Sequence, residues 1–196
     1  PKSVEDWLEE SRMSVPKEAV RRLYESLVSF PDESGFDLLT ALAAIYQGAN
    51  RNDEAVDVLT DAARRVTHDG QRLQVVAGMA AELSAVELQV QALEQAYRND
   101  AKYFEDLDAG LTQAGLFKKL VQVLVNRAQV LELEESIEEA QQMLERAAHL
   151  AQSKLDDGEW ALELLEKAAG LTKNVTDLET AFNLAFERED LLAQER

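Results

Sequence analysis

Apolar residues recur along this chain at steps of three and four, with polar residues between them. The stretch LLTALAAIYQGANRNDEAVDVLTDAARRV, residues 38–66, carries one apolar stripe that closes at Tyr46 and a second from Ala55 to Ala62. This spacing places the apolar side chains on one face of an α-helix. We find no run of alternating apolar and polar residues bounded by hairpin turns, which a half-buried β-strand would show. The pattern predicts an all-α protein of about ten helices in antiparallel pairs.

The apolar pattern repeats at an interval of 34 residues, which is typical of helical repeat proteins. Leu39, Leu42, Ala43, Leu59 and Ala62 are followed at that interval by Leu73, Val76, Ala77, Leu93 and Ala96. We expect the pattern to return about three residues early at Phe104, Leu107, Leu111, Leu120 and Leu124. After a longer first helix it returns at Leu144, Ala147, Ala148 and Ala151, and then at Ala161, Leu165 and Ala168.

These intervals predict a single helical repeat domain over residues 1–196. Its approximate units are 1–35, 36–69, 70–100, 101–135, 136–174 and a partial unit 175–196. The chain ends on a helical pattern with no following cap, so we expect it to be an excerpt of a longer protein.

Small residues stand at fixed points of the pattern where a core would ordinarily take leucine. Ala43, Ala55 and Ala62 are predicted contact points at which neighbouring helices approach closely, because ridges of one helix settle into grooves of the next. Leu42 and Leu59 are then expected, with Tyr46, to fill the space around those points. The pattern therefore favours nested helix pairs.

Helix starts and turns agree with this division. Capping boxes, in which two side chains satisfy free amides at a helix start, are predicted for Ser3 with Asp6, Ser136 with Glu139, and Thr176 with Glu179. Turn residues punctuate the pattern at Asn50–Asp53, Asp69–Gly70, Asn99–Asp100, Ala114–Gly115, Asp156–Gly158 and Lys173–Asn174.

On these residues the chain resembles the tetratricopeptide repeat family, in its bacterial type. Ala43, Tyr46, Ala55, Leu59 and Ala62 match the small, aromatic and alanine positions of the family's unit, and DDGEWALELLEKAAGL matches its second helix. The resemblance implies a right-handed superhelical solenoid of antiparallel helix pairs, with about five repeats. Departures are Gln89 and Leu120, each in place of an alanine, and the missing early tryptophan. Armadillo-like and enzyme-associated helical arrays remain alternatives.

The resemblance also implies a concave groove, lined by the first helix of each pair, that receives a peptide or protein partner. The implied lining is polar, short-chained and rich in amides, which suits hydrogen bonding to a peptide backbone. A carboxylate clamp of the chaperone-binding type is not expected, because Thr40 and Ala44 stand where its Lys and Asn would be. The groove candidates are Asp37, Thr40, Ala44, Gln47, Gln71, Gln74, Gly78, Ala81, Lys102, Glu105, Ala109, Thr112, Gln142, Glu145, His149 and Gln152.

The charge balance narrows the classes of partner. Acidic residues number 38 against 20 basic ones, a net charge of −18, so the surface would repel nucleic acid and anionic membranes. We expect a protein or peptide partner of basic character, no nucleic acid and no insertion into a membrane. Without a signal-like or membrane-spanning apolar run, we expect a soluble protein, with the cytoplasm favoured and the periplasm as the alternative.

Catalytic and metal-binding patterns are missing from the sequence. His68 and His149 are the two histidines, and cysteine is absent. No second histidine or cysteine lies within a helical turn of either, as a zinc site would require. Paired acids such as Glu138–Glu139 are explained by the positive end of the helix dipole. We therefore expect no enzyme, no cofactor and no metal. Gly78 and Gly110 fall inside predicted helices, where each either permits a close approach or leaves room for a ligand.

The leading interpretation is a non-catalytic scaffold that binds a partner in the groove. One alternative is self-association of a structural segment through an apolar end, for which Leu191 and Leu192 are candidates. Another is a ligand sensor or enzyme with a pocket near Glu145 and His149.

Overall fold

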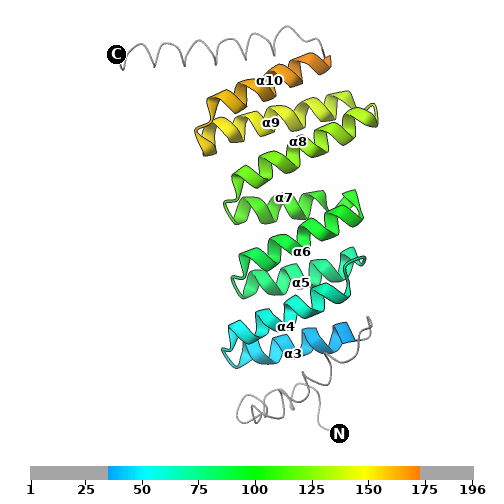
Figure 1. Cartoon of the computed structure of the whole chain (residues 1–196), viewed down its shortest axis with the longest axis vertical. Coiled ribbons are helices and arrows are strands. Elements are labelled where there is room, and N and C mark those ends of the chain that lie inside the picture. Colours follow the sequence, from blue (N-terminus) through cyan, green and yellow to red (C-terminus); the bar gives the residue numbers. More distant parts are fainter. Residues whose placement is uncertain (1–34, 173–196) are drawn as a thin grey trace, which may run out of the picture. The chain divides into compact units, whose positions relative to one another are not determined.

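The fold is described from a computed structural model of the whole chain, and the description covers residues 35–172. Every regular element in that range is a helix, which confirms the predicted all-α class (Figure 1). The elements are α3 (Phe36–Gly48), α4 (Asn52–Arg65), α5 (Gly70–Glu82), α6 (Val86–Asn99), the 3-10 helix η2 (Ala101–Tyr103), α7 (Phe104–Gln113), α8 (Phe117–Leu133), α9 (Ile137–Leu155) and α10 (Gly158–Thr172).

The chain divides into two compact units, Pro1–Gly110 and Leu111–Arg196. We call their described parts, 35–110 and 111–172, the N-terminal and C-terminal units. In the N-terminal unit, α3 packs against α4 and α5 against α6 as hairpins. In the C-terminal unit, α9 packs against both α8 and α10. The single domain and the superhelix proposed from the sequence stay predictions.

The 34-residue interval governs the helix starts of the N-terminal unit. The first helices α3, α5 and α7 begin at Phe36, Gly70 and Phe104, and the second helices α4 and α6 begin at Asn52 and Val86. The expectation that the third unit runs three residues early is therefore wrong for its first helix, α7. It is right for the second helix, α8, which begins at Phe117, 31 residues after α6, and which buries Leu120 and Leu124. Helix α7 starts on the interval but has 10 residues where α3 and α5 each have 13, so the shift arises at its end.

The predicted contact points lie in the core. Ala43, Ala55 and Ala62 are fully buried, and the side chain of Tyr46 is buried beside them in the same hairpin. A methyl side chain lets two helix backbones approach, and larger side chains fill the remaining space at close-packed density. The other residues of the repeating apolar pattern are buried as well, among them Leu42, Leu59, Leu73, Val76, Ala77, Leu93, Ala96, Leu144, Ala147, Ala148, Ala151, Ala161, Leu165 and Ala168.

Four turns between helices share one backbone geometry. In each, a residue with φ between 56° and 68° is followed by a residue whose amide donates to the carbonyl five positions earlier, which caps the preceding helix as a Schellman motif. Sequence analysis marked the turns at Asn50 and Gly115 but not those at Ser84 and Glu135, which carry no glycine. The bonds are Arg51 to Tyr46 at 2.9 Å, Ala85 to Ala80 at 2.8 Å, Leu116 to Leu111 at 3.0 Å and Ser136 to Leu131 at 2.9 Å.

Helix starts use other side-chain caps than those the sequence predicts. Ser136 is the N-cap residue of α9, but its side chain makes no capping hydrogen bond, so the predicted box with Glu139 is not formed. Asp69 does cap α5, accepting from the amide of Arg72 at 3.0 Å, and Asp157 accepts from the amide of Trp160 at 3.0 Å. The backbone amide of Ser136, which would donate to Glu139 in a capping box, already donates to the carbonyl of Leu131.

Two glycines mark places where neighbouring elements meet closely. A Cβ on Gly70 would lie 2.2 Å from Cε2 of Tyr103, and one on Gly110 would lie 2.5 Å from Cδ1 of Leu93. Gly110 therefore permits a close approach, one of the two roles predicted for it. Gly78 is different, because a Cβ there would meet nothing within 4 Å.

Several predictions fall outside the described residues. They are the capping boxes at Ser3 and Thr176, the turn at Lys173–Asn174, the units 1–35 and 175–196, and the edge candidates Leu191 and Leu192.

Candidate functional site

The accessible side of the first helices in the N-terminal unit carries the predicted groove positions. We call the exposed and half-exposed side chains of α3, α5 and α7 up to Gly110 the first-helix face. The predicted positions on α3 and α5 all belong to it: Asp37, Ala44, Gln71 and Gly78 are exposed, and Thr40, Gln47, Gln74 and Ala81 are half-exposed. The buried residues of the same helices point to the hairpin cores.

The structure shifts the third set of candidates by three residues. Lys102 lies in η2 rather than on a first helix, and its ammonium pairs with Asp100 at 2.9 Å. A hydrogen bond from the backbone amide of Lys102, together with its side chain, lowers the pKa of Asp100. Because α7 starts on the 34-residue interval, Glu105 and not Lys102 corresponds to Asp37.

The same shift changes the other members of this set. Glu105 is exposed on α7, and Asp108 takes the place of Thr40 and Gln74 but is buried, with 6% of its surface exposed. Ala109 and Thr112 are exposed, and Thr112 lies beyond Gly110, in the C-terminal unit. The first-helix face therefore ends with Glu105, Asp106 and Ala109.

Amide–carboxylate hydrogen bonds connect successive first helices across this face. Nε2 of Gln47 on α3 donates to Glu82 on α5 at 3.2 Å, and the amide of Gln74 on α5 donates to Asp106 on α7. Two of the predicted amides are thus already engaged, and each holds a carboxylate of the next first helix in place. Sequence reasoning missed Glu82 and Asp106, although both are acids at accessible positions of the predicted helices.

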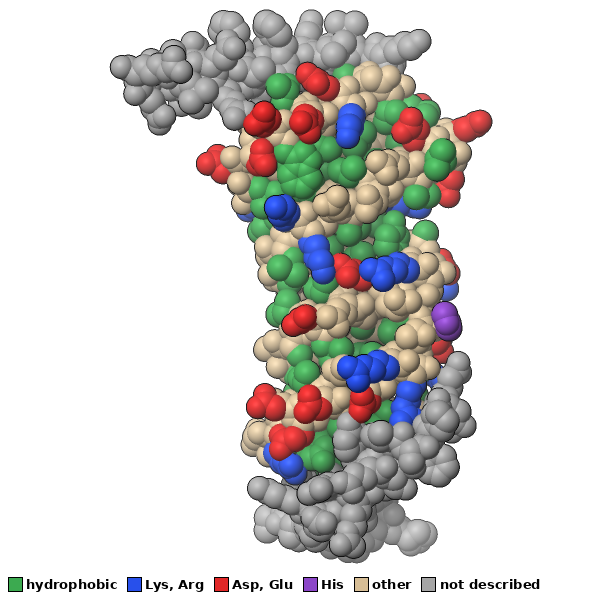
Figure 2. All heavy atoms as spheres, in the orientation of Figure 1, with side chains coloured by type: hydrophobic (Ala, Val, Ile, Leu, Met, Phe, Trp, Pro, Cys, Tyr) green, Lys and Arg blue, Asp and Glu red, His purple; other side chains and the backbone are tan. Residues whose placement is uncertain are grey.

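Charge and exposed apolar surface lie together on the first-helix face. Leu38 on α3 and Val75 on α5 are large apolar side chains that are 55% and 47% exposed. The basic side chain on these helices is Arg72, which pairs with Asp69 at 3.5 Å and lies 5.3 Å from the ring centre of Phe36. Figure 2 shows one side of the described helices in general, on which acidic, basic and hydrophobic side chains are interspersed.

The fourth set of candidates lies on α9 in the C-terminal unit. Gln142, His149 and Gln152 are exposed, and Glu145 is half-exposed and accepts a hydrogen bond from Gln141 at 2.6 Å. The other histidine, His68, is exposed in the turn before α5. No three His, Cys, Asp or Glu side chains within residues 35–172 come together as a potential metal site. Within the same range, no helix has the length and apolarity needed to cross a bilayer.

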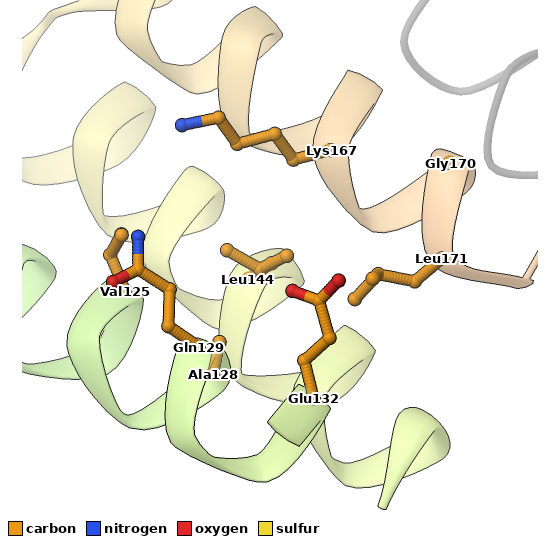
Figure 3. A pocket seen from close by; sticks show the side chains of 8 residues that line it. All are labelled: Val125, Ala128, Gln129, Glu132, Leu144, Lys167, Gly170 and Leu171. Carbon is orange, nitrogen blue, oxygen red and sulfur yellow. The ribbon is translucent and has the colours of Figure 1, made fainter. Parts of the chain in front are cut away.

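A groove that sequence analysis did not predict lies in the C-terminal unit, with a volume of about 400 Å³ (Figure 3). Leu144 of α9 forms part of its apolar lining, and a Cβ on Gly170 of α10 would meet nothing within 4 Å. Gln129 and Glu132 extend from α8 and Lys167 from α10 around this space. The remaining lining residues are Val125, Ala128 and Leu171. Periodicity alone does not show such a groove, because it depends on how far apart α8 and α10 lie.

Comparisons with known proteins give a fold likeness at low identity. No protein-family model and no curated protein matches the chain. Solved structures do match, among them "MamA 41-end from Desulfovibrio magneticus RS-1" at 16% identity and "MamA RS-1 ArsTM double mutant" at 15%. Each alignment covers 79% of this chain, with 86% and 85% of the respective MamA chains, and each has a TM-score of 0.36.

Proposed function

We propose that this chain is a non-catalytic interaction scaffold that binds a protein or peptide partner on its first-helix face. The observation that carries the proposal is the accessibility of every predicted position on α3 and α5, from Asp37 to Ala81, beside fully packed hairpin cores. Stacked helix pairs use such faces to hold extended or helical segments of other proteins. The resemblance to tetratricopeptide repeats supports the same function.

The chemistry of the face favours a basic partner with apolar side chains. Asp37, Glu82, Glu105 and Asp106 present carboxylates, whereas Arg72 is engaged with Asp69. Opposite charges across an interface steer association and exclude partners of the wrong sign. The partner's apolar side chains would cover Leu38 and Val75, which water now contacts.

A catalytic or ligand-sensing role has less support. His149 is exposed on α9, Glu145 is bound by Gln141, and neither lines the groove in the C-terminal unit. A general base needs a neighbour that orients it and a site that excludes water. The surroundings of His149 offer neither in the described part of the chain.

A steric block tests the scaffold function. Gly78 is exposed, and a Cβ there meets nothing, so Gly78→Trp is expected to fold normally while it covers the middle of the face. The matched control is Asp57→Trp, at an exposed position of the second helix α4. Affinity capture from native extract should recover a partner with wild type and with Asp57→Trp, and lose it with Gly78→Trp. Circular dichroism should give similar melting temperatures for all three proteins. Retention of the partner by Gly78→Trp would contradict the proposal, as would turnover of a small substrate.

A further inference from the structure

The groove between α8 and α10 is surrounded by polar side chains that are not engaged elsewhere. Gln129, Glu132 and Lys167 make no side-chain hydrogen bond or ion pair with any residue in the range 35–172. An apolar groove with a few convergent polar groups is the usual form of a binding site. One of these groups is a cation and one an anion, and they come from opposite walls of the groove (Figure 3).

Helix α8 carries the most exposed of the large apolar side chains in the described part of the chain. Leu133, at the last residue of α8, is 86% exposed, and Val130, one turn before it, is 41% exposed. Leu133 directly follows Glu132, so a projecting apolar side chain lies beside an apolar groove. Exposed apolar surface marks a site of association where it is contiguous, and here Leu133 adjoins the apolar lining of the groove.

We propose that a second copy of this chain occupies the groove. Leu133 of each copy enters the groove of the other copy, and Lys167 of each copy faces Glu132 of the other. A two-fold interface uses the same patch on both subunits, so the patch must complement itself. The patch complements itself in shape, because the projecting side chain of Leu133 and one wall of the groove both belong to α8. It complements itself in charge, because the groove is lined by one cation, Lys167, and one anion, Glu132.

Charge complementarity also decides between a second copy and a different partner. A highly basic partner would meet Lys167 at the rim, and a highly acidic one would meet Glu132, so each leaves one like-charge contact. A second copy places each of these two groove charges opposite its counterpart of the other sign. The interface lies in the C-terminal unit and does not use the first-helix face, so failure of the dimer leaves the proposed scaffold function untouched.

Sedimentation of the whole 196-residue chain tests the apolar contact. Wild type is expected to dimerise reversibly, and Leu133→Glu to raise the dissociation constant at least about tenfold, because the two-fold repeats each lost contact. Leu38→Glu is the matched control, since it places the same charge at an exposed leucine of the other unit and should leave dimerisation unchanged. A monomeric wild type overturns the proposal, as does equal weakening by both substitutions.

A charge exchange tests the ion pairs independently of any folding defect at Leu133. Lys167→Glu and Glu132→Lys should each weaken the dimer about tenfold, and the double variant should restore it to within about threefold of wild type. Restoration is expected because the exchanged charges again stand opposite each other across the interface. A double variant as weak as the single ones overturns the proposed pairing.

Discussion

The N-terminal and C-terminal units are built from similar amphipathic helices, but the second helices of their pairs lie at different distances from each other. Helices α3 to α6 have 13 or 14 residues, whereas α8, α9 and α10 have 17, 19 and 15. In the N-terminal unit the second helices α4 and α6 touch. In the C-terminal unit the groove lies between α8 and α10.

The connection between hairpins accounts for the difference. Residues 66–69 link α4 to α5, and the buried side chain of Val66 anchors this linker. The carbonyl of Thr67 accepts hydrogen bonds from Gln95 at 3.0 Å and Asn99 at 2.8 Å, which tie α6 to the linker. Helices α8 and α9 are joined by the tight turn 134–136, which offers α10 no such linker. A short linker whose carbonyl accepts hydrogen bonds from the next second helix thus holds second helices together, whereas the tight turn 134–136 has no such bond to α10.

The largest expected effect comes from exchanging the core residues that distinguish the units. Leu120 of α8 is fully buried where the repeat pattern expects alanine, and Ala55 of α4 is fully buried as that alanine. Leu120→Ala should lower the free energy of unfolding by about 2–5 kcal/mol, because it leaves a cavity. Ala55→Leu should lower it by about 1–3 kcal/mol through overpacking. Urea unfolding measures both. If either exchange is neutral, the two units pack more alike than the structure indicates.

A smaller contrast is expected between glycines of the two units. Gly70→Ala forces a methyl group against the ring of Tyr103 and should destabilise the protein by about 1–3 kcal/mol. Gly170→Ala meets nothing within 4 Å and should stabilise α10 by up to about 1 kcal/mol, since alanine is the better helix former. Thermal unfolding of the two variants distinguishes these signs. A stabilised Gly70→Ala protein would show that the ring of Tyr103 does not lie close against Gly70.

The smallest effect should come from the linker bonds. Asn99→Ala removes one of the two donors to Thr67 and should cost about 0.5–1.5 kcal/mol, with faster amide exchange in residues 66–69. Gln129→Ala in α8 is the control, because that side chain has no such bond, and its effect should stay within about 0.5 kcal/mol. Equal protection of the linker in both variants would show that the bond does not join α6 to it.

Much of the fold could be predicted because it depends on local spacing. The apolar residues of α3 and α5 define helix type, buried face and interval, and all of these are periodic properties of the sequence. The end of α7 could not be predicted in the same way. A loss of three residues before the start of α7 and a loss of three residues at its end both place α8 three residues early, so the sequence pattern does not distinguish them. The structure does, and it assigns Lys102 to η2 and Glu105 to the first position of the first-helix face.

The candidate site was predictable at the level of helix faces but not of individual bonds. Positions such as Gln47 and Gln74 follow from the helical phase, and they are accessible as expected. Their engagement with Glu82 and Asp106 depends on the offset between neighbouring first helices, which no single helix encodes. The groove around Leu144 depends on the separation of α8 and α10 and is likewise invisible in the helical phase.

The repeated turn bears on how a chain of this kind can grow. Each of its four occurrences satisfies its backbone groups by local bonds, and three of the four positive-φ residues are Asn50, Ser84 and Glu135 rather than glycine. Duplication of any segment that begins and ends at two such turns would carry with it the main-chain partners of the turns. Adding a helix pair to the protein would therefore require new side-chain packing only where the added pair meets its neighbours. It would require no new turn geometry.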